Sequence, residues 1–368
     1  MTNKFNASPY RPGDEEEIVQ LLELVFNGWP QFDLNCTPLD HWRWKYLDNP
    51  LRLNILYSAS FDNKIIGCTH TIPQRVKVGD KIFLSGTGAD VAVHPDFRRR
   101  GIHNKIVDSK LDFEAKIGIK FHYGISNNPI LIKRNMRRGF PLFPHDVSSF
   151  IRIYDVDLHL RMIPTKYAWI KKYGYQLLKI YNKLRNALRS YSSSDHDFHI
   201  SVILNFDDRI NTFWNKIKDN YSLIVERKQN YLNWRYCDPR GGDYTVIQAE
   251  KDGHVLGYGV LRINMYRGEY PVGHIVDLLT IPERLDVAGA LVEHAVIYFD
   301  KKDINTIQCL SIKNHPYERI LNRYGFINSR KKLNIFYQYY EGISENLKQV
   351  EKSSENKIHF AIGDYDAI

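Results

Sequence analysis

Residues 89–104 read Ala-Asp-Val-Ala-Val-His-Pro-Asp-Phe-Arg-Arg-Arg-Gly-Ile-His-Asn, and this stretch decides the fold. Val91 to Val93 predicts a short apolar strand that ends before Pro95, because proline cannot continue a strand ladder. A basic turn with Gly101 follows the strand. Apolar residues then recur at helical spacing, at Ile102, Ile106, Val107, Leu111 and Ala115. The predicted order is therefore strand, glycine turn and helix.

The turn between this strand and this helix predicts an anion-binding site. The first N–H groups of a helix have no partner inside the helix, and the helix dipole adds partial positive charge there. Gly101 has no Cβ, so a phosphate can approach its backbone closely. Arg98, Arg99 and Arg100 add fixed positive charge. A solvated basic turn without a ligand is the alternative interpretation.

The same sequence plan occurs twice along the chain, which is the strongest large-scale signal in it. The matching segments are 44–50 with 234–239, 61–67 with 251–257, 90–95 with 277–282, and Asn128 with Asn314 ahead of a Gly-Phe pair. These matches follow one another in the same order at nearly constant spacing. We interpret them as two copies of one domain.

Composition fits a soluble globular protein and excludes several classes. The chain has 368 residues, of which 43% are hydrophobic and 25% charged, which allows two domains with their own cores. No apolar run is long enough to span a membrane, and Met1 to Asp14 has no signal-peptide core, so we expect a cytoplasmic protein. The dispersed histidines and four cysteines show no metal-ligand spacing, so no metal is expected. The net charge of +9 suits an anionic ligand, a nucleic acid or a membrane surface.

The motif Arg98-x-x-Gly101-x-His103 resembles the acyl-CoA-binding motif of the GNAT acetyltransferase superfamily, usually written Gln/Arg-x-x-Gly-x-Gly/Ala. The preceding Val-x-Val-x-Pro is also typical of that family. His103 departs from the motif, because a small residue is usual at that position. The resemblance covers roughly residues 1–340. It implies an α/β (α+β) fold with two GNAT-like domains, each a mixed, mostly antiparallel sheet flanked by helices.

The repeat and the resemblance together predict four segments. An N-terminal GNAT domain with the acyl-CoA motif covers 1–156, and a degenerate GNAT-like domain covers 201–342. Residues 157–200 form a basic helical linker between them, and 343–368 form a C-terminal tail. Within the linker, 166–191 predicts a basic amphipathic helix. Packing on the protein and peripheral contact with a membrane both stay open for this helix.

The resemblance also implies where acyl-CoA binds. Its pantetheine arm is expected between strands near 87–94 and 119–126, which separate from each other in this family. Backbone groups of Ala92 and Val93 would bind the arm and polarise the thioester, and Asn128 matches an asparagine of the family's second motif. The pyrophosphate would be held at the turn, by Arg98, Arg99, Arg100, Gly101, Ile102 and His103.

Two residues are candidates for proton transfer. Many members of the family use an acidic residue on the strand before the motif to take the acceptor's proton, and here that residue is Asp90. Asp277 occupies the same place in the second copy, so a structural role for both is the alternative. The tyrosine that often serves as general acid is replaced by Asn135, so Tyr123 is the second candidate; water as the acid, or a reaction that needs none, are the alternatives. Three histidines near the same place are interpreted as structural: His94, His103 and His122.

These features predict an N-acetyltransferase that moves an acetyl or other acyl group from acyl-CoA to an amine. The acceptor is a small molecule, with amino sugars and cell-envelope precursors as the classes considered. Two alternatives stay open: an aminoacyl or peptidyl transferase of the peptidoglycan-bridge type, and a non-catalytic CoA-binding protein. The intact turn from Arg98 to Gly101 favours the first prediction, so a nucleic-acid partner is not expected.

Overall fold

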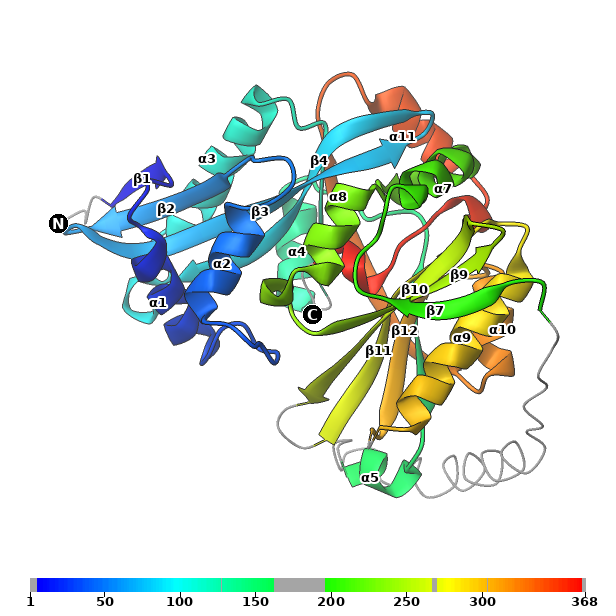
Figure 1. Cartoon of the computed structure of the whole chain (residues 1–368). Coiled ribbons are helices and arrows are strands. Elements are labelled where there is room, and N and C mark those ends of the chain that lie inside the picture. Colours follow the sequence, from blue (N-terminus) through cyan, green and yellow to red (C-terminus); the bar gives the residue numbers. More distant parts are fainter. Residues whose placement is uncertain (1–4, 127, 162–195, 267–269, 303, 366–368) are drawn as a thin grey trace. The chain divides into compact units, whose positions relative to one another are not determined.

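The computed structural model describes residues 5–126, 128–161, 196–266, 270–302 and 304–365. The predicted helix at 166–191 lies outside the described residues. The chain packs as two compact units whose elements are labelled in Figure 1. Unit 1 consists of 1–146, 205–243 and 333–368, and unit 2 of 147–204 and 244–332. No helix in the described part of the chain is long and apolar enough to cross a membrane.

A mixed sheet forms the centre of unit 1. Its strands lie in the order β1 (Asn6–Pro9), β2 (Ile55–Phe61), β3 (Lys64–Val78), β4 (Lys81–Val93), β5 (Phe121–Ser126) and β13 (Ile327–Tyr339). The short strand β8 (Leu223–Val225) pairs with the end of β3. The pair β4–β5 is parallel and the other neighbouring pairs are antiparallel.

Helices cover both faces of this sheet. Neighbouring residues of a strand point to opposite faces. On β3, His70 contacts Trp42 of α2 (Pro38–Tyr46), while Thr71 contacts Glu114 of α3 (Ile102–Lys116). Helix α1 (Glu15–Phe26) packs beside α2, and α2 and α3 therefore lie on opposite faces (Figure 1). The remaining helices of this unit are α4 (Pro129–Arg137), α7 (Arg209–Ile217), α8 (Gln229–Leu232) and α11 (Ser344–Glu351).

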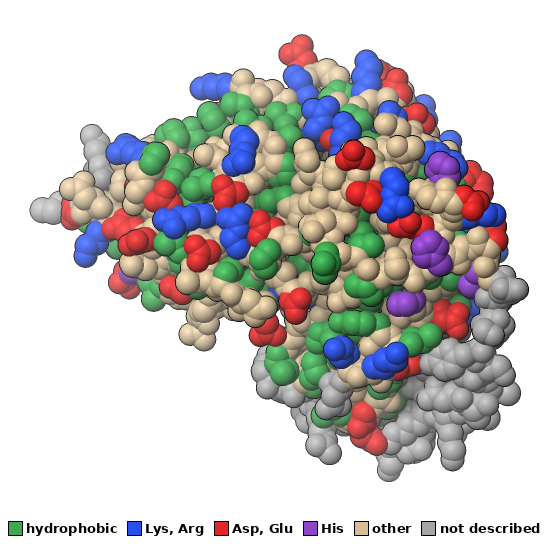
Figure 2. All heavy atoms as spheres, viewed as in Figure 1, with side chains coloured by type: hydrophobic (Ala, Val, Ile, Leu, Met, Phe, Trp, Pro, Cys, Tyr) green, Lys and Arg blue, Asp and Glu red, His purple; other side chains and the backbone are tan. Residues whose placement is uncertain are grey.

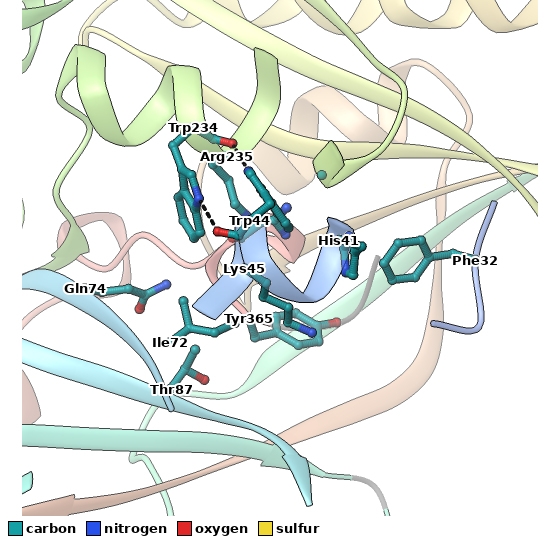
Figure 3. A pocket seen from close by; sticks show the side chains of 12 residues that line it. Phe32, His41, Trp44, Lys45, Ile72, Gln74, Thr87, Trp234, Arg235 and Tyr365 are labelled. Carbon is teal, nitrogen blue, oxygen red and sulfur yellow. Dashed lines mark hydrogen bonds between the residues drawn. The ribbon is translucent and has the colours of Figure 1, made fainter. Parts of the chain in front are cut away.

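The two copies of the repeated tryptophan segment pack against each other inside unit 1. The indole N–H of Trp44 donates to the carbonyl oxygen of Trp234 at 3.0 Å, and that of Trp234 donates to Trp44 at 3.1 Å (Figure 3). The two rings stack with centroids 5.0 Å apart. Such reciprocal bonds are what a local twofold relation between two like segments produces. Trp42, Trp44 and Tyr46 are 0%, 3% and 2% exposed, so this aromatic cluster packs in the core.

Unit 2 repeats the strand plan of unit 1. Its sheet order is β6 (Val147–Ile153), β12 (Thr306–Ile312), β11 (Tyr270–Thr280), β10 (His254–Tyr266), β9 (Tyr244–Lys251) and β7 (His199–Ile203). The pair β11–β12 is parallel and the others are antiparallel, as in unit 1. Helix α9 (Leu285–Asp300) packs on β10 and β11, α10 (Tyr317–Arg323) packs on α9, and α5 (Val156–Arg161) follows β6. The predicted α/β class with mixed, mostly antiparallel sheets is confirmed.

The compact units differ from the linear boundaries predicted at 1–156 and 201–342, because the two copies exchange elements. Strand β6 follows the first copy in sequence but pairs with β12 of the second. Strand β13 follows the second copy but pairs with β5 of the first. The repeated segment within 205–243 also packs in unit 1. The linear boundaries stay a prediction about the repeat, and the units describe the packing.

Candidate active site

Strands β4 and β5 pair over a short stretch and then separate. Their pairs are Ser85 with Phe121, Gly86 with His122 and Thr87 with Tyr123, and no later pair occurs among the described residues. The edge of β4 from Gly88 to Val93 therefore has no strand partner on the β5 side in this part of the chain. A cavity of about 320 Å³ opens at the separation. Its lining includes Gly88, His103, His122, Gly124, Arg134 and Gln338.

Strand β4 bulges next to this cavity. Ala92 pairs with Cys68 and Ala89 with His70, so Asp90 and Val91 share one position opposite β3. The φ angle of Asp90 is +40°, in the left-handed region that Asp tolerates better than most residues. The bulge directs Val91 to the cavity, while the Asp90 carboxylate contacts residues of α2 on the other face.

The basic turn forms an open helix start. No side chain among the described residues caps α3 at Gly101, whose φ is +81°, and a Cβ there would meet nothing within 4 Å. Arg98 Nε donates to the Val93 carbonyl at 3.3 Å, and Arg100 donates to the Asp96 carbonyl at 3.0 Å. The buried Ile102, which is 2% exposed, anchors the helix start in the core. The first N–H groups of α3 therefore lie next to a turn whose guanidinium groups are exposed.

His103 connects the turn with the cavity, because it lies in the first turn of α3 and lines the cavity. Its Nε2 lies 3.0 Å from Arg134 Nη2 of α4. Burial and then the charge of Arg134 lower the pKa of His103 to about 4, so its ring is neutral at pH 7. Asn128 lies just before α4, and its N–H donates to Ser126 Oγ at 3.0 Å. The first turn of α3, the strand gap and α4 thus all border one cavity.

Residues 6–134, which contain this whole arrangement up to α4, match the acetyltransferase (GNAT) domain family. The chain therefore contains a GNAT domain. It is a GNAT-type acyltransferase that uses acyl-CoA. Comparison with curated protein sequences found no match.

Solved structures show the same fold across the length of this acyltransferase. A probable N-acyltransferase from Enterococcus faecalis aligns with a TM-score of 0.62 at 12% identity, over 94% of this chain and 74% of that one. N-myristoyltransferase from Saccharomyces cerevisiae, solved with myristoyl-CoA, aligns with a TM-score of 0.60 at 12% identity, over 93% and 81%. A GCN5-related N-acetyltransferase from Anabaena variabilis aligns with a TM-score of 0.58 at 11% identity, over 91% and 73%.

In this acyltransferase the Asp90 carboxylate is saturated with donors. Trp29 Nε1 donates to Oδ1 at 2.8 Å, and Lys45 Nζ and the Tyr46 hydroxyl donate to Oδ2 at 2.8 and 2.5 Å. Burial raises the pKa of Asp90, but the neighbouring positive charge, above all that of Lys45, and the hydrogen bonds from Lys45 and Tyr46 together outweigh it, and the pKa falls to about 2. A carboxylate with so low a pKa is a weak proton acceptor. Its surroundings favour the structural alternative for Asp90.

Tyr123 lies on the face of the sheet opposite the cavity. Its hydroxyl is 2.5 Å from Gln74 Oε1 and 2.5 Å from the Asp364 carbonyl oxygen. Burial raises the pKa of Tyr123 well above its ordinary value. Since side chains alternate along β5, it is His122 and Gly124 that line the cavity. The structure therefore does not bring Tyr123 together with the cavity.

A second and much smaller space lies on that opposite face (Figure 3). It measures about 20 Å³ and is lined by Lys45, Gln74, Thr87 and Tyr365 among others. Thr87 is the last residue of β4 that pairs with β5. Gly88 beside it lines the larger cavity. The two spaces thus flank the point where β4 and β5 begin to separate.

The structure also reveals a buried charged cluster that the sequence analysis did not single out. Lys110 Nζ lies 2.9 Å from Glu114 Oε1, and His122 Nδ1 lies 3.0 Å from Glu114 Oε2. Thr71 Oγ1 lies 2.5 Å from Glu114 Oε1. A sequence signal for it exists in α3: Ile102, Ile106, Lys110 and Glu114 follow one another at a spacing of four, so charged residues continue a buried apolar row.

Proposed function

We propose that this protein is an N-acetyltransferase that moves an acetyl or longer acyl group from acyl-CoA to a small-molecule amine. The observation that carries the proposal is that His103 belongs both to the open start of α3 and to the lining of the cavity between β4 and β5. An anion site and a strand gap are thereby joined into one extended site. Amino sugars and cell-envelope precursors are the acceptor classes to test first.

The pyrophosphate of acyl-CoA would bind at the start of α3. The N–H groups of residues 101–103 and the guanidinium groups of Arg98, Arg99 and Arg100 supply donors and positive charge there. The pantetheine arm would follow the unpaired edge of β4, where backbone groups of Ala92 and Val93 can replace a strand neighbour. Asn128, just beyond β5, would contact the same arm. The thioester would then reach the point where the strands begin to separate.

The charge distribution supports a small anionic cofactor over a nucleic acid. Lys and Arg side chains are interspersed with Asp and Glu over the face drawn in Figure 2. Among the described residues on that face, the Lys and Arg side chains do not gather into one basic patch. A long nucleic acid is bound through many phosphates along a continuous basic surface. We therefore rank a tRNA-dependent transferase below the CoA-dependent enzyme.

The cofactor assignment is tested at Gly101. Gly101→Asp should weaken acetyl-CoA binding roughly 100-fold or more, because it places a carboxylate beside the pyrophosphate. Gly101→Asn has the same shape and the same positive φ without the charge, so it should lose much less affinity. Gly118→Asp, at the other end of α3, also has open space and a positive φ of +86° and should bind normally. Calorimetry with acetyl-CoA and myristoyl-CoA measures all three variants. Unchanged affinity of a folded Gly101→Asp variant would contradict the assignment.

A further inference from the structure

The imidazole of His122 stands at the inner end of the cavity, where β4 and β5 begin to separate. Its residue pairs with Gly86, and its ring lies against Gly88, the first residue of β4 beyond the paired stretch. A Cβ on Gly88 would be 3.2 Å from His122 Nε2. The absence of a side chain at Gly88 therefore lets the ring approach the free edge of β4, along which a pantetheine arm would lie.

The other ring nitrogen of His122 faces a fully buried carboxylate at ion-pair distance. Nδ1 lies 3.0 Å from Glu114 Oε2, and the Glu114 side chain is 0% exposed. Glu114 is itself fixed by Lys110 Nζ at 2.9 Å and by Thr71. A carboxylate at Nδ1 orients the ring and stabilises its protonated form. In this orientation Nε2 is the nitrogen on the side of the cavity.

The charges around His122 come from several elements. Lys110 and Glu114 face it from α3, and His103 and Arg134 line the same cavity. Tyr340 interacts with Glu114, and Gln338 of β13 is the strand partner of His122 on β5. Burial alone would raise the pKa of Glu114, but the charges of His122 and Lys110 hold it well below its ordinary value. The carboxylate thus stays ionised beside the imidazole.

Three buried polar atoms show that the same cavity suits a polar ligand. Among the described residues, His103 Nδ1, Arg134 Nε and Gln338 Oε1 have no hydrogen-bond partner. Each of these residues lines the cavity. Buried polar groups without partners are costly, and a bound polar chain such as pantetheine would supply partners for them.

We propose that His122 is the acid that protonates the thiolate of CoA as it leaves, and that Glu114 and Lys110 are its positioning residues. This inference rests on the proposed function. Asn135, at the position of the family's tyrosine, carries an amide and cannot serve as this acid, and Tyr123 lies on the other face of the sheet. His122 is the side chain that combines a proton-donating nitrogen with a position at the inner end of the cavity.

The reaction can be written so that each proton and electron pair has a destination. The acceptor nitrogen attacks the carbonyl carbon of the thioester, and a C–N bond forms. The C–S bond breaks and its electron pair goes to sulfur, which takes the proton of His122 Nε2–H. The acceptor nitrogen loses its extra proton to water, and the imidazole regains a proton from solvent. The products are the acylated amine and CoA with a free thiol.

The proposal is tested with CoA itself, because no acceptor is then needed. A cation near a thiol lowers its pKa. The thiol of bound CoA should therefore ionise about one to two pH units below the value near 8.5 of an unperturbed thiol. Thiolate absorbance measures this, with desulfo-CoA as the blank that cancels the protein's own cysteines. In His122→Gln the shift should shrink by at least half, while CoA affinity and melting temperature stay near wild type.

Two further variants separate the inference from the proposed function. Glu114→Gln should also reduce the shift, because the protonated ring loses its carboxylate. His145→Gln is the matched control, since its imidazole bonds the Val350 carbonyl away from the cavity, and it should keep the full shift. Bound CoA that titrates identically on wild type and His122→Gln would overturn the role of His122 and leave the cofactor assignment standing. Failure of wild type to bind CoA would overturn the proposed function.

Turnover provides a second readout once an amine from the panel is accepted. A general acid contributes typically 10²–10⁴-fold, and a thiolate is a good leaving group, so His122→Gln should lower kcat by roughly 100-fold. KM for acyl-CoA should stay unchanged, because the interaction is made during bond breaking. A His122→Gln enzyme with wild-type kcat would also overturn the proposal.

Discussion

The carboxylate of Asp90 accepts hydrogen bonds from Trp29, Lys45 and Tyr46, so one side chain connects β4 with two preceding segments. Its pair with Lys45 is nearly buried, with side-chain exposures of 4% for Lys45 and 10% for Asp90. Removing one partner of a buried pair leaves the other charge without compensation. In the second copy Asp277 also lies beside a bulge and accepts from the Tyr258 hydroxyl at 3.0 Å. This shared placement is what a structural role predicts.

We therefore predict that Asp90→Asn lowers the free energy of unfolding by about 3–5 kcal/mol at pH 7. Because the folded-state pKa of Asp90 is lowered from 3.8 to about 2, its contribution is complete above pH 4 and is lost as the pH falls toward 2. The stability gap between wild type and variant should narrow by about 2 kcal/mol over that window. Urea unfolding at several pH values measures the gap. Asp277→Asn should also be destabilising, whereas loss of turnover in Asp90→Asn alone, with unchanged melting temperature, would support Asp90 as the proton acceptor.

At the scale of single elements, local patterns in the sequence predicted the strand and the helix that border the cavity. Strand β4 ends at Val93 and α3 begins at Ile102, as the apolar spacing and Gly101 indicate. The bulge at Asp90 could not be predicted, because it is defined by pairing with β3. The partner of His122 was equally hidden: Glu114 is close in space and belongs to another element. Contacts between elements, unlike helix starts, leave only weak traces in local spacing.

The contact between the two tryptophan segments gives a prediction at this scale. A Cβ on Gly241 would lie 2.6 Å from the ring of Trp44, which is buried and cannot move away easily. Gly241→Ala should therefore lower the free energy of unfolding by about 1–3 kcal/mol through overpacking. Gly289→Ala in α9 meets nothing within 4 Å and should raise it by about 0.5–1 kcal/mol. Urea unfolding compares the two, and a Gly241→Ala variant as stable as wild type would contradict the close contact.

At the scale of the whole molecule, the repeat in the sequence predicted two related sheets, and both occur. The exchange of β6 and β13 between the copies could not be predicted. Each strand could form the same antiparallel hydrogen bonds with the matching strand of its own copy. The local sequence therefore predicts which strands form, and long-range pairing determines which of the two sheets each strand joins. The burial of the C-terminal segment was hidden for the same reason: Asp364 forms a fully buried pair with Arg227, far away in sequence.

The two copies should differ in cofactor binding, which gives a prediction for the whole chain. Strands β11 and β12 also stop pairing, after Ile275 and Cys309, so a separation of strands occurs in both copies. The helix starts differ: α3 follows a glycine turn, whereas Arg284 before α9 is neutralised by Asp286 and Asp197 at 2.7 and 2.9 Å. A phosphate there would meet two carboxylates in place of free arginines. We expect calorimetry to give one CoA per chain in wild type and none in Gly101→Asp. A stoichiometry of two, or one remaining site in Gly101→Asp, would show that the strand separation alone binds CoA and that the turn is dispensable.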